Sequence, residues 1–132
     1  MGERNRETEL AERFARCGKV LTAIGDETRQ YLITEMMKMG QCGGVRVGAI
    51  TEKTNLSRPA VSHHLQILKD AGMLKVRKEG TRNYYYFDSG MECLKELIAT
   101  LELAVEIAEE LPERRERGGA GVPDARSGES GK

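Results

Sequence analysis

The strongest constraint on the fold lies in the middle of the chain, where signals for the start and the end of a helix enclose a regular apolar stripe. Ser57 is suited to cap a helix, and Pro59 follows in the first turn, where its missing N–H costs nothing. Gly72 is placed to end the helix. The spacing predicts a helix over residues 58–71 with one buried face, formed by Val61, Leu65 and Leu68 with Ile67 beside them.

The segments on both sides complete the order of elements in a winged helix-turn-helix. Residues 47–54 predict a short helix, which a tight turn connects to the helix that follows. Residues 73–78 and 83–87 alternate between apolar and polar side chains, as strands do, and the turn between them contains a glycine. We therefore expect a mostly α-helical fold with a two-stranded β-hairpin as its wing.

Further amphipathic helices are expected at the two ends of the domain. Apolar residues recur every three or four positions from about residue 9 to Ile24, where Gly25 ends the first helix, and again over residues 91–111. Between them, Asp26 caps a mostly buried helix that stops at Gly40. The chain is expected to divide into a frayed N-terminus, one winged helix-turn-helix domain with both terminal helices, and a disordered tail: residues 1–8, 9–111 and 112–132.

Charge is unevenly distributed along the chain, although 21 basic and 21 acidic residues give a net charge of zero. Residues 58–82 contain six basic and two acidic side chains, whereas residues 88–113 contain eight acidic side chains and one lysine. The basic middle of the chain favours a local anion-binding surface.

The composition also bears on the compartment. The chain has neither a stretch of 18 consecutive apolar residues nor an apolar segment near its N-terminus, which argues against a transmembrane helix and a secretory signal. Three widely spaced cysteines do not form a disulfide framework and fit a reducing compartment. We expect a cytoplasmic protein with no membrane partner.

The polar face of the helix over residues 58–71 carries groups that suit the edges of DNA bases. The N-terminal end of a recognition helix enters the major groove, where arginine pairs with guanine and glutamine with adenine. Basic residues near the hairpin tip can reach phosphates or the minor groove. His64 points about 100° away from His63 and is expected to bind the backbone or a phosphate. The residues expected to contact double-stranded DNA are Ser57, Arg58, Pro59, Ala60, Ser62, His63 and Gln66 on the helix, and Arg77, Lys78, Arg82 and Asn83 on the hairpin.

Several segments carry a resemblance to a known family. Residues 56–74, with the sequence LSRPAVSHHLQILKDAGML, resemble the recognition segment of ArsR/SmtB-type winged-helix repressors, and residues 76–86 resemble their wing. Residues 25–29 are similar to the start of their second helix, and residues 47–51 to the start of the first helix of the motif. The resemblance spans about residues 10–111. It implies a homodimeric repressor that binds a DNA operator and pairs through its first and last helices.

The last helix independently suggests a dimer, because a domain of this size has limited core to cover its apolar stripe. The alternative is that the stripe packs on Leu10, Phe14 and Leu21 of its own chain. The residues expected at the dimer interface are Leu10, Phe14, Leu94, Leu97, Leu101, Ala104 and Ala108.

Neither a metal site nor a cofactor is expected. Relatives of this type hold metals through a Cys-x-Cys pair before the helix-turn-helix or through Asp/His pairs on the last helix. Here Cys42 has no such neighbour, and residues 91–111 contain no histidine and only Cys93. Cys17 lies on an apolar stripe and is expected to be a buried thiol.

Some questions stay open at this stage. A thiol switch between Cys42 and Cys93 is an alternative form of the same repressor, and a protein-binding winged helix without DNA binding is another alternative. An enzyme is not expected, because no nucleophile–base set, phosphate loop or pair of catalytic carboxylates is visible. The operator sequence and the effector are left open.

Overall fold

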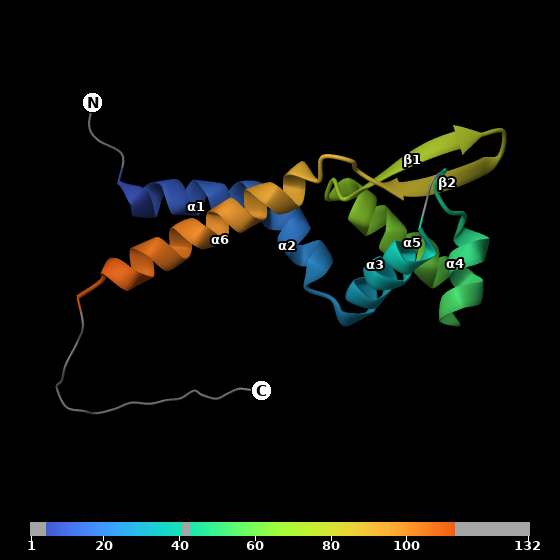
Figure 1. The fold of residues 1–132 in the computed structure, drawn as a ribbon, viewed down its shortest axis with the longest axis horizontal. Coiled ribbons are helices and arrows are strands. Elements are labelled where there is room, and N and C mark those ends of the chain that lie inside the picture. Colours follow the sequence, from blue (N-terminus) through green and yellow to red (C-terminus); the bar gives the residue numbers. More distant parts are fainter. Residues whose placement is uncertain (1–4, 41–42, 113–132) are drawn as a thin grey trace.

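The computed structural model describes residues 5–40 and 43–112. Within them the chain forms six helices and one antiparallel sheet of two strands (Figure 1). The elements are α1 (Arg6–Arg16), α2 (Gly18–Ile24), α3 (Glu27–Met39), α4 (Val47–Thr54), α5 (Arg58–Asp70), β1 (Leu74–Glu79), β2 (Arg82–Phe87) and α6 (Glu92–Glu110). The expected mostly α-helical fold with a two-stranded wing is confirmed.

The core lies where helices α2 to α5 and the wing meet; we call residues 18–87 the head. The buried face of α5 belongs to the same core cluster as side chains of α3 and α4, and α5 lies directly against α2, α4 and β1. Burying a leucine-sized side chain contributes about 1.5–3 kcal/mol, so these residues supply much of the stability of the head. Its fully buried side chains include Leu32, Met36, Ile50, Val61, Leu65, Leu68 and Met73.

The ends of α4 and α5 follow the signals in the sequence. The side chain of Ser57 accepts a hydrogen bond from the N–H of Ala60 at 3.2 Å, and a proline occupies the first turn of α5. Asn55 ends α4 with a left-handed backbone (φ 60°), a conformation that asparagine tolerates well. Residues 47–54 form the predicted helix, and α5 ends one residue before the predicted boundary.

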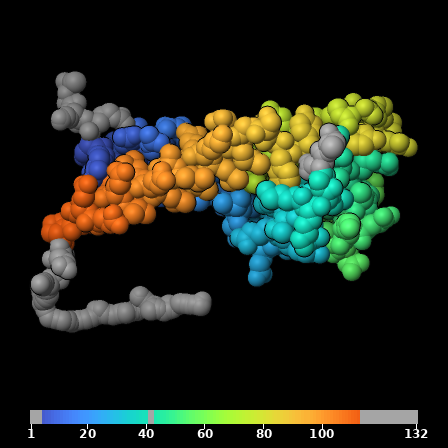
Figure 2. All heavy atoms as spheres, in the orientation of Figure 1, coloured from blue at the N-terminus to red at the C-terminus, as the bar shows by residue number. Residues whose placement is uncertain are grey.

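Helices α1 and α6 lie side by side in opposite directions and extend away from the head (Figure 1); we call this pair the arm. Arg6 at the start of α1 pairs with Glu106 (3.7 Å) and Glu110 at the end of α6. Arg16 at the other end of α1 pairs with Glu96 at 3.2 Å. Figure 2 shows α6 as a continuous exposed surface along one side of the molecule.

The prediction of a single helix from about residue 9 to Ile24 is wrong in two respects. The side chain of Asn5 accepts from the N–H of Thr8 at 2.7 Å, so the helix begins at Arg6, where fraying was expected. The helix is then interrupted at Cys17, before Gly18. The interruption lets α1 follow α6 while α2 turns into the head. Residues 1–4 and 113–132, which include most of the expected tail, lie outside the described residues.

The loop before α4 adds a third segment beside the wing, which the sequence did not predict. Val45 and Tyr85 exchange two backbone hydrogen bonds of 2.8 Å. Gly44 approaches β2 closely with a φ of +93°, and a Cβ there would lie 3.1 Å from the Cβ of Tyr84 and from the carbonyl oxygen of Tyr85. The glycine therefore allows the loop to reach the sheet.

This close approach leads to a stability prediction. Gly44→Ala should destabilise the protein by about 2 kcal/mol or more, because it combines a disfavoured φ with a clash against the backbone of β2. Chemical denaturation would measure the change. Gly18→Ala is the matched control, because an added Cβ there meets nothing within 4 Å, and the change should be neutral or stabilising by up to about 1 kcal/mol. Equal stability of the two variants would contradict the role of Gly44.

Candidate nucleic-acid interface

Helix α5 has two sharply different faces. Its buried face is formed by Val61, Leu65 and Leu68. The residues predicted to contact DNA lie on the other face, and all of them are exposed except Ala60, which is half-buried: Ser57, Arg58, Pro59, Ala60, Ser62, His63 and Gln66. The structure thus brings these side chains together on one accessible surface, which begins at the N-terminus of α5.

Two of these side chains already have neighbours within the chain. The guanidinium of Arg58 lies over α4, where a Cβ at Gly48 would be 3.3 Å from its Nη1. The amide of Gln66 donates to Asp70 at 3.0 Å, one turn along the helix. An exposed hydrogen bond such as that of Gln66 contributes little, so this side chain can exchange its neighbour for a ligand at low cost.

The wing presents its polar residues around a two-residue turn, shorter than the predicted one. Gly80 lies in this turn with a φ of +63°, and Lys78 faces Asn83 while Glu79 faces Arg82 across the strands. Lys78, Arg82 and Asn83 are exposed. Three of the four predicted wing residues are therefore accessible near the tip.

Arg77, the fourth predicted wing residue, is engaged within the chain. Its guanidinium donates to Glu79 and to the carbonyl oxygen of Gly43, both at 2.6 Å, and lies 4.6 Å from the centre of the Tyr84 ring. These contacts connect the wing to the loop before α4. A contact of Arg77 with DNA stays a prediction, whereas its role in holding the wing follows from the geometry.

The two neighbouring histidines differ as the helix geometry requires. His63 is exposed on the polar face of α5, and His64 is half-buried. The Nδ1 atom of His64 lies 3.2 Å from Nη1 of Arg29, a residue of α3. The partner of His64 within the chain is therefore a side chain of another helix and not the backbone, and a contact of His64 with phosphate stays a prediction. Sequence spacing does not relate α3 to α5, so no local signal pointed to this contact.

Two of the three cysteines, Cys17 and Cys93, lie among the described residues, and both are free thiols. Cys17 is buried, as predicted, and its Sγ lies 3.6 Å from Oγ1 of Thr100. Burial raises the pKa of the Cys93 thiol, which disfavours the reactive thiolate at neutral pH. Cys42 lies outside the described residues, so the proposed switch between Cys42 and Cys93 stays untested. Among residues 5–40 and 43–112, no three His, Cys, Asp or Glu side chains come together as a potential metal site.

The apolar residues of α6 are divided between two faces. Leu97 is only 5% exposed and packs in the core of its own chain, so its assignment to a dimer interface is wrong. Leu94 and Ala104 are half-buried, and Leu101 and Ala108 are exposed. On α1, Leu10 is half-buried and Phe14 is exposed.

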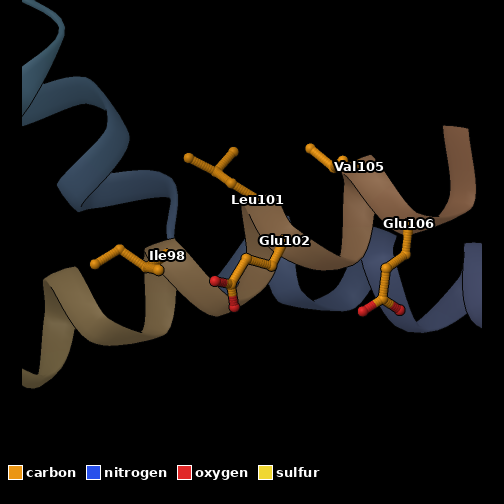
Figure 3. Close-up of a pocket in the computed structure, with 5 residues that line it drawn as sticks. All are labelled: Ile98, Leu101, Glu102, Val105 and Glu106. Atoms are coloured by element: carbon orange, nitrogen blue, oxygen red, sulfur yellow. The ribbon is translucent and has the colours of Figure 1, made fainter. Parts of the chain in front are cut away.

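The outward stripe of α6 contains two residues that the sequence reading missed. Ile98, Leu101 and Val105 are 55%, 44% and 54% exposed. Figure 3 shows them along one side of α6, with Glu102 and Glu106 beside them. The steps from Leu94 to Ile98, Leu101 and Val105 are four, three and four residues, so a second helical stripe was present in the sequence. Only the packing of α1 reveals which stripe faces inward.

Comparisons with known proteins agree with this geometry. The model of the arsR family of bacterial regulatory proteins matches residues 26–76. The chain is 37% identical over 75 residues to an uncharacterized HTH-type transcriptional regulator of Methanocaldococcus jannaschii, a match that covers 57% of this chain and 81% of the relative. It is 38% identical over 66 residues to the transcriptional repressor SdpR of Bacillus subtilis, a match that covers 50% of this chain and 69% of that repressor.

Solved structures show the same fold. An ArsR-like transcriptional regulator from Rhodococcus sp. RHA1 superposes with a TM-score of 0.58 at 22% identity and covers 73% of this chain and 86% of its own. A second solved structure is the homodimeric winged helix-turn-helix DNA-binding domain of a possible ArsR-family regulator from Mycobacterium bovis. It superposes with a TM-score of 0.52 at 25% identity and covers 89% of this chain and 99% of its own.

The helix-turn-helix, the exposed polar face of α5 and the wing define the class of winged helix-turn-helix proteins. The chain belongs to the ArsR family of bacterial regulatory proteins. The resemblance inferred from the sequence is thereby confirmed, and the relatives named here are transcriptional regulators rather than enzymes.

The contacts of Arg77 lead to a prediction about the wing. Arg77→Ala should remove the connection to Gly43 and weaken the local structure by about 1 kcal/mol. Amide hydrogen exchange at Val45 and Tyr85, whose N–H groups hold the loop to β2, should then be about fivefold faster. Lys78→Ala, an exposed neighbour, should leave both exchange rates unchanged. Unaltered exchange in Arg77→Ala would show that the guanidinium does not stabilise the wing.

Proposed function

We propose that the protein is a homodimeric, sequence-specific DNA-binding transcriptional repressor that acts in the cytoplasm. The chief support is α5, whose apolar face is fully buried while its polar face is open from the N-terminal end onward. A helix held in this way can enter the major groove without losing its packing. The relatives, described as transcriptional regulators and, for SdpR, as a repressor, support the same function.

The polar face of α5 is proposed to read the base sequence. Arg58 can donate two hydrogen bonds to a guanine, and Gln66 can both donate to and accept from an adenine. Ser62 and His63 lie on the same exposed face and can bond to neighbouring bases or phosphates. Pro59 and Ala60, in the first turn, offer apolar surface to a thymine methyl group.

The wing is proposed to bind the DNA backbone. Lys78, Arg82 and Asn83 are exposed near the turn and can donate to phosphates or reach into the minor groove. Phosphate contacts fix the position of the protein on the duplex but carry no sequence information. Arg77 would contribute indirectly by holding the wing in place.

The outward stripe of the arm is proposed to form the dimer interface with a second copy of the chain. Ile98, Leu101 and Val105 form an apolar strip that one chain leaves uncovered. Ala108, three residues after Val105 on the same helix, is also exposed and extends the strip, and Phe14 of α1 is exposed as well. The Mycobacterium bovis relative, described as homodimeric, supports this arrangement. A two-fold dimer would present its α5 helices to half-sites about 34–36 Å apart.

The different roles proposed for α5 and the wing can be tested with a DNA duplex that the full chain selects from a pool of random sequences. Arg58→Ala should weaken binding to this duplex by about 1–3 kcal/mol and relax the preference at one base pair. Arg82→Ala should weaken binding to all duplexes alike and reduce the slope of log affinity against log salt by about one. Fluorescence anisotropy at several salt concentrations would measure both effects.

The control for both variants is Lys38→Ala, which removes a positive charge from α3, where Lys38 pairs with Glu35 at 3.0 Å. Its affinity should equal that of the parent. Parental binding by Arg58→Ala and Arg82→Ala would refute the proposed DNA-binding surface.

The proposed interface leads to a prediction about assembly. Leu101→Glu combined with Val105→Glu should yield a folded monomer, because both side chains are exposed in one chain, whereas a dimer would bury the new charges. Sedimentation velocity would give the oligomeric state, and circular dichroism would confirm folding. Met37→Glu on α3, a position 55% exposed, is the matched control and should remain dimeric. A doubly substituted protein that stays dimeric would place the interface elsewhere.

A further inference from the structure

Arg29 is a charged residue inside the head, only 8% exposed, and the DNA-binding surface does not use it. Buried charges are costly unless hydrogen bonds compensate them. Its Nε donates to the carbonyl oxygen of Ala23 at 2.8 Å, and its Nη2 donates to that of Thr22 at 3.1 Å. Its Nη1 lies 3.2 Å from Nδ1 of His64. All three nitrogens of the guanidinium therefore have partners.

These partners belong to two helices, α2 and α5, and Arg29 belongs to a third. Thr22 and Ala23 lie in the last turn of α2, where carbonyl groups lack the usual partner four residues on and carry partial negative charge, and the carbonyl of Thr22 also accepts from the N–H of Gly25 at 3.3 Å. Arg29 itself lies in the first turns of α3, and its N–H donates to the capping carboxylate of Asp26 at 3.0 Å. His64 lies on α5, next to the exposed His63. The guanidinium thus connects the corner between α2 and α3 to the recognition helix.

The contact with His64 exists in only one protonation state. Arginine remains charged at any physiological pH, and each of its nitrogens can only donate. Nδ1 of His64 must therefore accept, so the ring is neutral and carries its proton on Nε2. A second proton would occupy Nδ1, turn the acceptor into a donor and place two cations 3.2 Å apart. The hydrogen bond would then break.

The surroundings of His64 favour the neutral ring. Burial lowers the pKa of His64, and Arg29 and His63 act in the same direction, while the carboxylate of Asp26 opposes them. The contact is complete above the usual histidine pKa of about 6.5. When the pair is open, His64 has a higher pKa than when the pair is closed, so the open state binds a proton more strongly. As the pH falls below about 6.5, the open state is therefore favoured and the contact is progressively lost.

We propose that Arg29 and His64 form a positioning pair that fixes the rotation of α5, and that uptake of a proton by His64 opens the pair and weakens DNA binding. The second half rests on the proposed function. A helix with its side chains has a radius of about 5–6 Å, so a rotation of about 10° moves its outer atoms by about 1 Å. Such a shift is enough to disrupt hydrogen bonds to base edges, which require donor–acceptor distances within a few tenths of an ångström.

The pair can be tested in the free protein, independently of DNA. Nitrogen–proton NMR correlation spectra at about pH 7.5 should show His64 neutral, with its proton on Nε2. The fitted pKa of His64 should lie below the ordinary value of about 6.5 and should rise in a folded Arg29→Gln protein, because a nearby positive charge is removed. A proton on Nδ1 at neutral pH would overturn the pair, whether or not the substituted protein folds.

The effect on DNA binding is tested with a histidine replacement that keeps the acceptor. His64→Asn places Oδ1 near the position of Nδ1 but cannot take up a proton. Because His63 is a second histidine and lies on the DNA-binding face, both proteins compared should carry His63→Asn. Between about pH 7.5 and 5.5, His63→Asn alone should lose about threefold or more in affinity for the selected duplex. The protein with both asparagines should change by less than about twofold.

His64→Leu, also made with His63→Asn, provides the complementary variant. It retains a side chain of similar bulk but no acceptor, so its affinity at about pH 7.5 should already be reduced by about threefold or more. His64→Asn should restore the affinity. If DNA affinity changed with pH in the same way in the proteins with and without His64, the proposed effect on binding would be overturned. If no variant bound DNA at any pH, the proposed function would fail, while the NMR tautomer would still decide the existence of the pair.

Discussion

The head depends on one requirement, which is that α5 buries one face completely and leaves the other free. An isolated helix of 13 residues is marginal in water, so its stability has to come from packing. Leu32 and Met36 of α3 and Ile50 of α4 are fully buried in the same core as its apolar stripe. Because the core packs against only one face of α5, the orientation of the helix is fixed while its polar residues stay exposed. A surface of this kind can enter a groove of DNA as a rigid unit.

The arm follows a different principle, because two paired helices have no third layer to cover both sides. The inner face holds Leu97, Thr100 and Ile107. The ion pairs between α1 and α6 are largely exposed and contribute only about 0–1 kcal/mol each, so they define the direction of the pair more than its stability. The outward stripe of α6 stays uncovered in one chain, and we propose that a second copy of the chain covers it. Among the described residues, none of the helices has the length and apolar character needed to cross a membrane.

Two arginines connect parts of the head that are distant in the sequence. Arg77 joins the wing to the loop before α4, and Arg29 joins the corner of α2 and α3 to α5. The planar guanidinium suits this task, since it offers five donors in a fixed arrangement and keeps its charge. In a sequence, such an arginine looks the same as one that binds phosphate. The sequence alone therefore predicts Arg77 only as a DNA contact and assigns no role to Arg29.

The sequence by itself determined the elements that rest on local interactions. Ser57, Pro59 and the periodic apolar residues specify α5, because caps and helical spacing act over a few residues. The bounds of α4 and the alternation in the wing are local in the same sense. The tertiary structure decided which of two overlapping stripes on α6 faces inward, where the helix breaks at Cys17 and which side chain meets His64. These depend on contacts between segments far apart in the sequence, such as that of Cys17 with Thr100, 83 residues further along the chain, and only packing in three dimensions selects among them.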